Sequence, residues 1–161
     1  MNVIADATAK QTMHDIRRHE GLRLTAYLCT ANVWTIGFGW TGLVNGKRID
    51  TNTTINRGQA ESLLLESLAV ATVDALQLVP GLRLMNLARQ SVIVNMSFNL
   101  GLTRLRGFRK ALYHVNISHD FASAAREMLD SKWARQVGSR SVELADRMRS
   151  GQILTTHLLK R

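Results

Sequence analysis

Two short stretches near the start of the chain carry its most informative pattern. Residues 20–29 read EGLRLTAYLC and residues 33–39 read VWTIGFG. A carboxylic acid, a thiol and a hydroxyl stand at Glu20, Cys29 and Thr35, separated by eight and then by five residues. Across the same span the apolar residues change from helical to strand-like spacing. The pattern therefore predicts a helix that ends near Glu20, followed by a strand that carries Thr35.

The residues around this pattern predict a helix and then a small sheet. Residues 11–19 form an amphipathic, charged stretch, and Gly21 is a good helix stop. Residues 24 to about 55 are rich in β-favouring types, and Asn45-Gly46 is a hairpin signal because both residues tolerate positive φ. We therefore expect an antiparallel sheet over this region.

Helices are expected in the rest of the chain. Asn56 and Gln59 form a capping box at the start of a helix over 57–79, which ends before Pro80 and is roughly 30 Å long, enough to bridge two lobes. Residues 84–100 are apolar on nearly every side, as in a buried helix, and Gly101 ends them. Further helices are predicted at 104–115, 119–131 and 139–149, with no strand after Pro80. The fold class is α+β.

The composition of the chain indicates what kind of partner it binds, but not which reaction it catalyses. The chain has 161 residues, 21 Lys and Arg against 12 Asp and Glu, and a net charge of +9, which draws it to polyanions such as nucleic acid, anionic lipid or the bacterial envelope. Its single cysteine excludes an internal disulfide. Residues 1–11 lack the apolar run of a signal peptide, and no segment has the ~20 apolar residues of a membrane span.

A carboxylic acid at a helix end suits the acid of glycoside hydrolysis. That reaction needs a proton donor for the leaving oxygen and a second group that handles attack at the anomeric carbon. Glu20 fits the donor role if its surroundings keep it protonated. A helix–turn–strand step would place Cys29 and Thr35 on the opposite wall of a cleft. We therefore take Glu20, Cys29 and Thr35 as candidate catalytic residues.

This pattern resembles the active-site signature of the phage lysozymes of the T4 type, in which a Glu, usually an Asp, and a Thr follow one another at these spacings. The resemblance covers most of the chain, through segments 95–101, 107–108 and 131–133. It implies a lysozyme-like fold in one domain, residues 1–161. A mixed lobe over about 12–58 would be joined by the connecting helix 59–79 to a helical lobe over 80–161.

The resemblance also implies roles for residues late in the chain. Arg140 would pair with Glu20, and Asn99 and Gln136 would border the substrate groove as substrate-binding residues. The implied activity is that of an endolysin, a muramidase that hydrolyses the β-1,4 bond between N-acetylmuramic acid and N-acetylglucosamine of bacterial peptidoglycan and so lyses the host.

Two positions depart from the pattern of the family. Trp40 follows Gly37-Phe38-Gly39 where a His is common, so any ion pair of that His is absent. Cys29 replaces the usual Asp, and a thiol with an ordinary pKa of about 8.5 is mostly protonated at neutral pH, whereas an Asp with a pKa of about 3.9 is ionised. Cys29 could be a nucleophile or base if its pKa is lowered, could leave room for a water bound by Thr35, or could be idle.

Three alternatives remain from the sequence alone. A lytic transglycosylase would cut the same bond. A nucleic-acid-binding protein would use the basic segment Arg104, Arg106, Arg109 and Lys110, although no recognition helix can be defined. A non-enzymatic envelope disruptor would use the cationic, amphipathic tail over 153–161.

The resemblance implies a monomer that needs no cofactor. No metal site is expected, because the chain has one Cys and its His14/His19 and His114/His119 pairs lack the i,i+4 spacing of a zinc-binding helix. The partner would be peptidoglycan, with no nucleic acid and no stable membrane insertion. The protein would wait in the host cytoplasm and reach the murein layer in the periplasm after a separate holin permeabilises the membrane.

Overall fold

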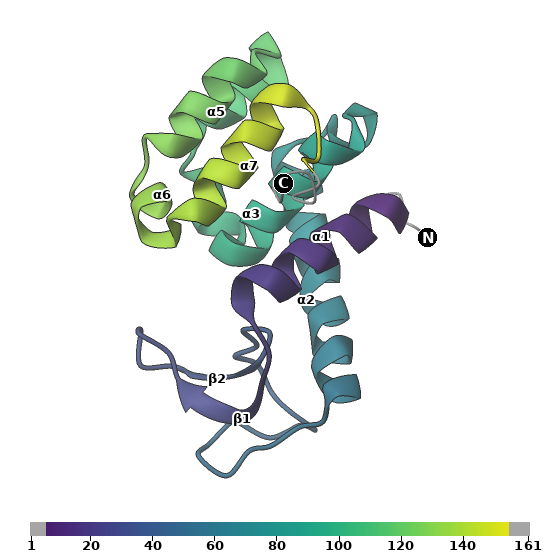
Figure 1. The fold of residues 1–161 in the computed structure, drawn as a ribbon, viewed down its shortest axis with the longest axis vertical. Helices are drawn as coiled ribbons and strands as arrows, with labels where there is room; N and C mark the ends of the chain where they lie inside the picture. Colours follow the sequence, from purple (N-terminus) through teal and green to yellow (C-terminus); the bar gives the residue numbers. More distant parts are fainter. Residues whose placement is uncertain (1–5, 155–161) are drawn as a thin grey trace, which may run out of the picture. The chain divides into compact units, whose positions relative to one another are not determined.

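The computed structural model describes residues 6–154 and shows seven α-helices with one antiparallel sheet of two strands (Figure 1). This confirms the α+β prediction. Of the predicted amphipathic tail, residues 155–161 lie outside the described part of the chain. In chain order the elements are α1 (Asp6–Glu20), β1 (Arg23–Leu28), β2 (Trp34–Gly37), α2 (Arg57–Leu78), the 3-10 helix η1 (Leu82–Leu84), α3 (Leu87–Arg106), α4 (Arg109–Tyr113), the π-helix η2 (His114–Ser118), α5 (Phe121–Leu129), α6 (Lys132–Val137) and α7 (Ser139–Ser150).

The chain forms two compact units, one from a continuous stretch of sequence and the other from two separate stretches. The sheet unit is Met13–Val70, and the helical unit combines Met1–Thr12 with Ala71–Arg161. The boundaries at 12/13 and 70/71 fall inside α1 and α2, so each of these helices belongs to both units. The lobe boundaries implied by the family resemblance remain a prediction.

The sheet of the sheet unit is smaller than the sequence predicts. β1 and β2 pair with Tyr27 opposite Thr35 and Leu28 opposite Trp34. From Gly37 to residue 154, the strand-like residues make only isolated bridges, because successive turns interrupt strand pairing before a third strand can form. The predicted hairpin turn is confirmed: Val44 and Lys47 exchange backbone hydrogen bonds of 2.9 and 3.0 Å across Asn45 and Gly46, whose φ angles are 50° and 75°.

The start of α2 has the predicted capping box. The Asn56 side chain accepts from the backbone N–H of Gln59 at 2.9 Å, and the Gln59 side chain accepts from the Asn56 N–H at 2.8 Å. One turn later, Glu61 accepts three hydrogen bonds from Arg17 of α1, at 2.7, 3.1 and 3.2 Å. These bonds connect the last turn of α1 to the first turns of α2.

The core of the helical unit is built around α3. Every residue of α3 from Gln90 to Ser97 is buried, as the apolar character of this segment predicts. The apolar faces of α5 and α7, which run side by side in Figure 1, supply Ala124, Met128, Leu144 and Met148 to the core. Gly101 interrupts α3 with φ of 72°, and a further helical segment continues to Arg106.

One predicted helix differs from the observed one, and one observed helix was not predicted. The helix predicted at 104–115 begins only at Arg109, because Gly107 and Phe108 separate it from α3, and it changes to π-helical turns at His114. The short helix α6 was not predicted. It begins at Ser131, whose hydroxyl accepts from the Ala134 N–H at 3.0 Å, and is too short to show a helical period in the sequence.

Polar contacts connect distant parts of the helical unit. Thr8 of α1 donates to the Gln90 side chain at 2.8 Å in a buried setting. Arg89 of α3 donates to the carbonyls of Met148 and Arg149 at 2.8 and 3.2 Å, and Asn86 donates to the Gly151 carbonyl at 3.1 Å. The last carbonyls of α7, which lack partners within their helix, are therefore satisfied from α3.

Candidate active site

Glu20 is the last residue of α1 and is half-buried. The helix stops there because Gly21 takes φ of 70° and its N–H closes the last turn on the Arg17 carbonyl at 3.1 Å. The predicted place of Glu20 at a helix end is thus confirmed, while its role is untested.

A tight turn after β2 lies against the Glu20 carboxylate. Ile36 and Trp40 exchange backbone hydrogen bonds of 2.9 and 2.8 Å, which reverses the chain at Gly37-Phe38-Gly39. A Cβ added to Gly39 would lie 3.5 Å from Glu20 Oε2, and Gly39 has φ of 88°. Gly39 is therefore suited both to this conformation and to a close approach of the backbone to the acid.

Cys29 and Thr35 meet where β1 turns into β2. The Cys29 N–H donates to the Val33 carbonyl at 3.0 Å, and the Thr35 hydroxyl donates to the same carbonyl at 2.9 Å. The Cys29 side chain is half-buried, whereas Thr35 is buried. The structure thus brings these two residues together in one hairpin, and their predicted place on a cleft wall opposite Glu20 stays a prediction.

The hairpin turn favours the ionised form of the thiol. Hydrogen bonds from the backbone N–H groups of Val33 and Ala31, and a smaller one from the Thr35 hydroxyl, lower the pKa of Cys29 from its ordinary value. Since the Thr35 hydroxyl has one proton, it can donate either to the Val33 carbonyl or to the thiolate. The Cys29 thiol therefore loses its proton at a lower pH than an ordinary cysteine, although partial burial opposes this shift.

The candidate substrate-binding residues belong to the helical unit. The Asn99 side-chain oxygen accepts from Trp133 Nε1 at 2.8 Å, so its amide group is held in a fixed orientation. Arg140 is buried and donates to Asn95 Oδ1 through Nε at 3.2 Å and Nη2 at 2.9 Å, while Gln136 is exposed on α6. The pairing of Arg140 with Glu20 would join residues of different units and remains a prediction.

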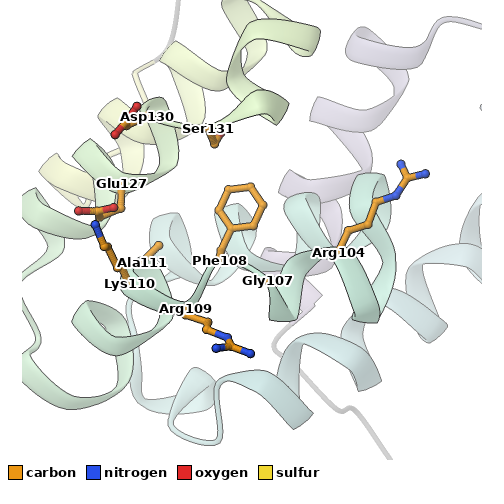
Figure 2. Close-up of a pocket in the computed structure, with 9 residues that line it drawn as sticks. All are labelled: Arg104, Gly107, Phe108, Arg109, Lys110, Ala111, Glu127, Asp130 and Ser131. Atoms are coloured by element: carbon orange, nitrogen blue, oxygen red, sulfur yellow. The ribbon is translucent and has the colours of Figure 1, made fainter.

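A pocket of about 590 Å³ in the helical unit was missed by the sequence analysis (Figure 2). Phe108 lies at its centre and packs edge-on against Trp133, with ring centroids 6.0 Å apart. Its other lining residues include both signs of charge: Arg104, Arg109, Lys110, Glu127 and Asp130. From the sequence, these basic residues suit a nucleic-acid patch or a solvated basic face that favours adsorption to an anionic wall. Glu127 comes from α5 and Asp130 directly follows this helix, so only the tertiary structure brings them to the same pocket as the basic residues.

Residues 6–154 also bear on two other classes of site, metal centres and membrane spans. Within that range, no group of three or more His, Cys, Asp or Glu side chains could hold a metal ion. The same range contains no helix that combines the length and the apolar character needed to cross a bilayer.

Comparison with known proteins identifies the family. The sequence model described as phage lysozyme matches residues 17–150, which include Glu20, Cys29 and Thr35. An endolysin of Acyrthosiphon pisum secondary endosymbiont phage 1 is 32% identical over 122 residues, covering 74% of this chain and 75% of that protein. An endolysin of Salmonella phage P22 is 29% identical over 119 residues, covering 73% and 78% of the two chains. The chain therefore belongs to the phage lysozyme family.

Proposed function

We propose that the protein is a phage endolysin that hydrolyses the β-1,4 bond between N-acetylmuramic acid and N-acetylglucosamine in peptidoglycan. The observation that carries the proposal is the placement of Glu20 at the end of α1, against the Gly37-Phe38-Gly39 turn, in a chain of the phage lysozyme family. The net charge of +9 favours adsorption to an anionic cell wall.

In this proposal, Glu20 protonates the glycosidic oxygen as the bond to the anomeric carbon breaks. Cys29 and Thr35 organise the attacking group on the other side of the sugar. The lowered pKa of Cys29 supports an active thiolate, which could attack the anomeric carbon directly or accept a proton from an attacking water.

The helical unit would hold other parts of the same polymer. Asn99 and Gln136 would border the substrate groove, and Arg140 would pair with Glu20. The pocket around Phe108 supports a peptidoglycan ligand, because its basic and acidic residues suit a peptide that carries both carboxylates and an amine.

The decisive experiment replaces Glu20 with Gln and measures clearing of purified murein sacculi. Loss of activity by several powers of ten with unchanged thermal unfolding is expected, since general acid catalysis alone contributes about 10²–10⁴. Glu66→Gln, an exposed carboxylate of α2, is the matched control and should keep full activity. A Glu20→Gln protein that clears sacculi at the parent rate would refute the assignment.

Product analysis separates hydrolysis from the transglycosylase alternative. Digestion in isotopically labelled water, followed by mass analysis, should give reducing-end muramic acid that carries the label. Anhydromuramic ends without the label would instead identify a lytic transglycosylase.

The role of Cys29 has its own test. We expect Cys29→Asp to retain activity, and Cys29→Ser or thiol alkylation to lower it most at the higher pH values, where the thiolate is present. If neither replacement nor alkylation changes the rate at any pH, Cys29 is idle.

The proposed biological setting follows from this activity. The protein would act as a monomer, without cofactor, and would pass from the host cytoplasm to the murein through a lesion made by a separate holin. A nucleic-acid-binding protein would show steeply salt-dependent retention on duplex DNA. Because we propose a cell-wall hydrolase instead, we expect weak retention on DNA and strong clearing of murein.

A further inference from the structure

A second pocket lies in the sheet unit, lined by side chains to which the proposed mechanism gives no role. It measures about 360 Å³, in the range of roughly 300–1,000 Å³ that small-molecule sites occupy. Apolar side chains, one indole, one hydroxyl and one guanidinium line it: Val33, Trp34, Thr41, Leu43, Ile49 and Arg48, with the backbone of Gly42.

Trp34 places this pocket on the opposite side of β2 from the candidate catalytic hydroxyl. Successive side chains of a strand point to opposite faces, so Trp34 and Thr35 face different sides of the hairpin. Thr35 is buried, whereas Trp34 is half-buried and lines the pocket. One strand thus carries both the candidate catalytic residue Thr35 and a residue of the pocket.

Trp40 holds the wall of the pocket in place. Its indole Nε1 donates to the Leu43 carbonyl at 3.1 Å. A Cβ at Gly42 would lie 2.6 Å from the Trp40 ring, so the indole lies directly against the Gly42 backbone. The residue that departs from the usual His of the family therefore fixes the loop 41–43, and the absence of a side chain at Gly42 is what allows it.

The pocket has one charge and it is positive. Arg48 is exposed and, within residues 6–154, has no carboxylate at salt-bridge distance. It directly follows the turn at Asn45-Gly46, whose backbone hydrogen bonds join Val44 and Lys47. A guanidinium and an indole that line one pocket suit a ligand that presents both an apolar face and a carboxylate.

We propose that this pocket is an accessory binding site for an anionic glycopeptide, in which a pyranose ring lies on Trp34 and a carboxylate of the attached peptide binds Arg48. The inference rests on the proposed function, because it takes the cell-wall polymer as the ligand. Exposed Val33 and Leu43, at 44% and 55% exposure, would be covered by the bound sugar and peptide.

The test measures binding without turnover, in the Glu20→Gln protein. A soluble murein disaccharide-tetrapeptide is titrated while amide and indole N–H signals are followed by NMR. We expect the Trp34 indole and the Leu43 and Ile49 amides to shift together with one dissociation constant. Tetra-N-acetylchitotetraose, which has no carboxylate, should bind this site at least tenfold more weakly.

Two variants of neighbouring basic residues separate a direct contact of Arg48 with the ligand from a general effect of positive charge. Arg48→Gln should weaken binding at this site about tenfold, as expected for loss of a charge-assisted hydrogen bond. Lys47→Gln removes the same charge one residue away, does not line the pocket, and should change binding less than twofold. Trp40→His, which removes the bond to Leu43, should weaken binding at the site while the remaining NMR spectrum keeps its dispersion.

Three results would overturn the inference. These are an absence of shifts at the pocket at saturating disaccharide-tetrapeptide, equal affinity for chitotetraose, and equal effects of Arg48→Gln and Lys47→Gln. Murein clearing by the protein with Glu20 intact is measured separately, so a silent pocket in an active enzyme would reject this site and leave the proposed hydrolase unaffected.

Discussion

Exchange of Arg17 and Glu61 for Gln, singly and together, measures how firmly the helix end that carries Glu20 is held. Arg17 lies one turn before Glu20 and donates three hydrogen bonds to Glu61, the shortest at 2.7 Å. The side chains are 37% and 27% exposed, so solvent screens the pair. Exposed ion pairs contribute about 0.2–1 kcal/mol to the free energy of unfolding. The bidentate geometry of this pair favours the upper end of that range. We expect a coupling energy of about 1 kcal/mol.

The coupling energy should depend on pH in a defined direction. The hydrogen bonds from Arg17, with its charge and that of Arg57, lower the pKa of Glu61 below its ordinary value. A carboxyl whose folded-state pKa is lowered stabilises the fold above its unfolded-state pKa of about 4.3, and that contribution is lost as the pH falls through the folded-state pKa. The coupling should therefore be full at neutral pH and disappear in acid.

The assay is urea denaturation of the four proteins of the cycle across this pH range, in low and high salt. A second cycle with Arg57→Gln is the control, because Arg57 acts on Glu61 through its charge, and should give about 0.3 kcal/mol. A coupling for Arg17 no larger than that for Arg57, or one that persists unchanged in acid, would refute the reasoning.

Three further predictions concern stability and are all measured by denaturant unfolding. Asn56→Ala should cost about 1 kcal/mol through loss of the cap on α2, whereas Asn56→Ser should cost much less; equal losses would contradict the capping role. Leu144→Ala, at a fully buried position, should cost about 2–5 kcal/mol, and a cost below about 1 kcal/mol would show that the core between α3 and α7 is loosely packed. Trp133→Phe removes the donor to Asn99 and should cost about 1–3 kcal/mol; the double variant with Asn99→Leu should recover part of this loss, unless the bond contributes nothing.

Local sequence signals predicted much of the fold because they act within a few residues. The Asn56–Gln59 box, the Asn45-Gly46 turn and the stop at Gly21 all satisfy backbone groups nearby, and each was confirmed. The extent of the sheet was overestimated, since β-favouring composition describes residues and not their pairing partners. The short helix α6 has too few turns for a detectable period.

The candidate site was predictable only in part, for a similar reason. Cys29 and Thr35 lie close together in the hairpin of β1 and β2, whereas their place on a cleft wall opposite Glu20 stays a prediction. The lowered pKa of Cys29 depends on the orientation of the Val33 and Ala31 amides, which spacing cannot reveal. The pocket around Phe108 joins residues from three helices and could not be found from any single stretch.

The division of α1 between two units bears on the order in which the chain can fold during synthesis. Residues 13–70 complete the sheet unit and leave the ribosome as one continuous stretch, with Glu20, Cys29 and Thr35 all included. The start of α1 must wait, because buried Thr8 bonds to Gln90, 82 positions later in the chain. The half of the helix that carries the candidate acid can therefore reach its native surroundings before the half that precedes it.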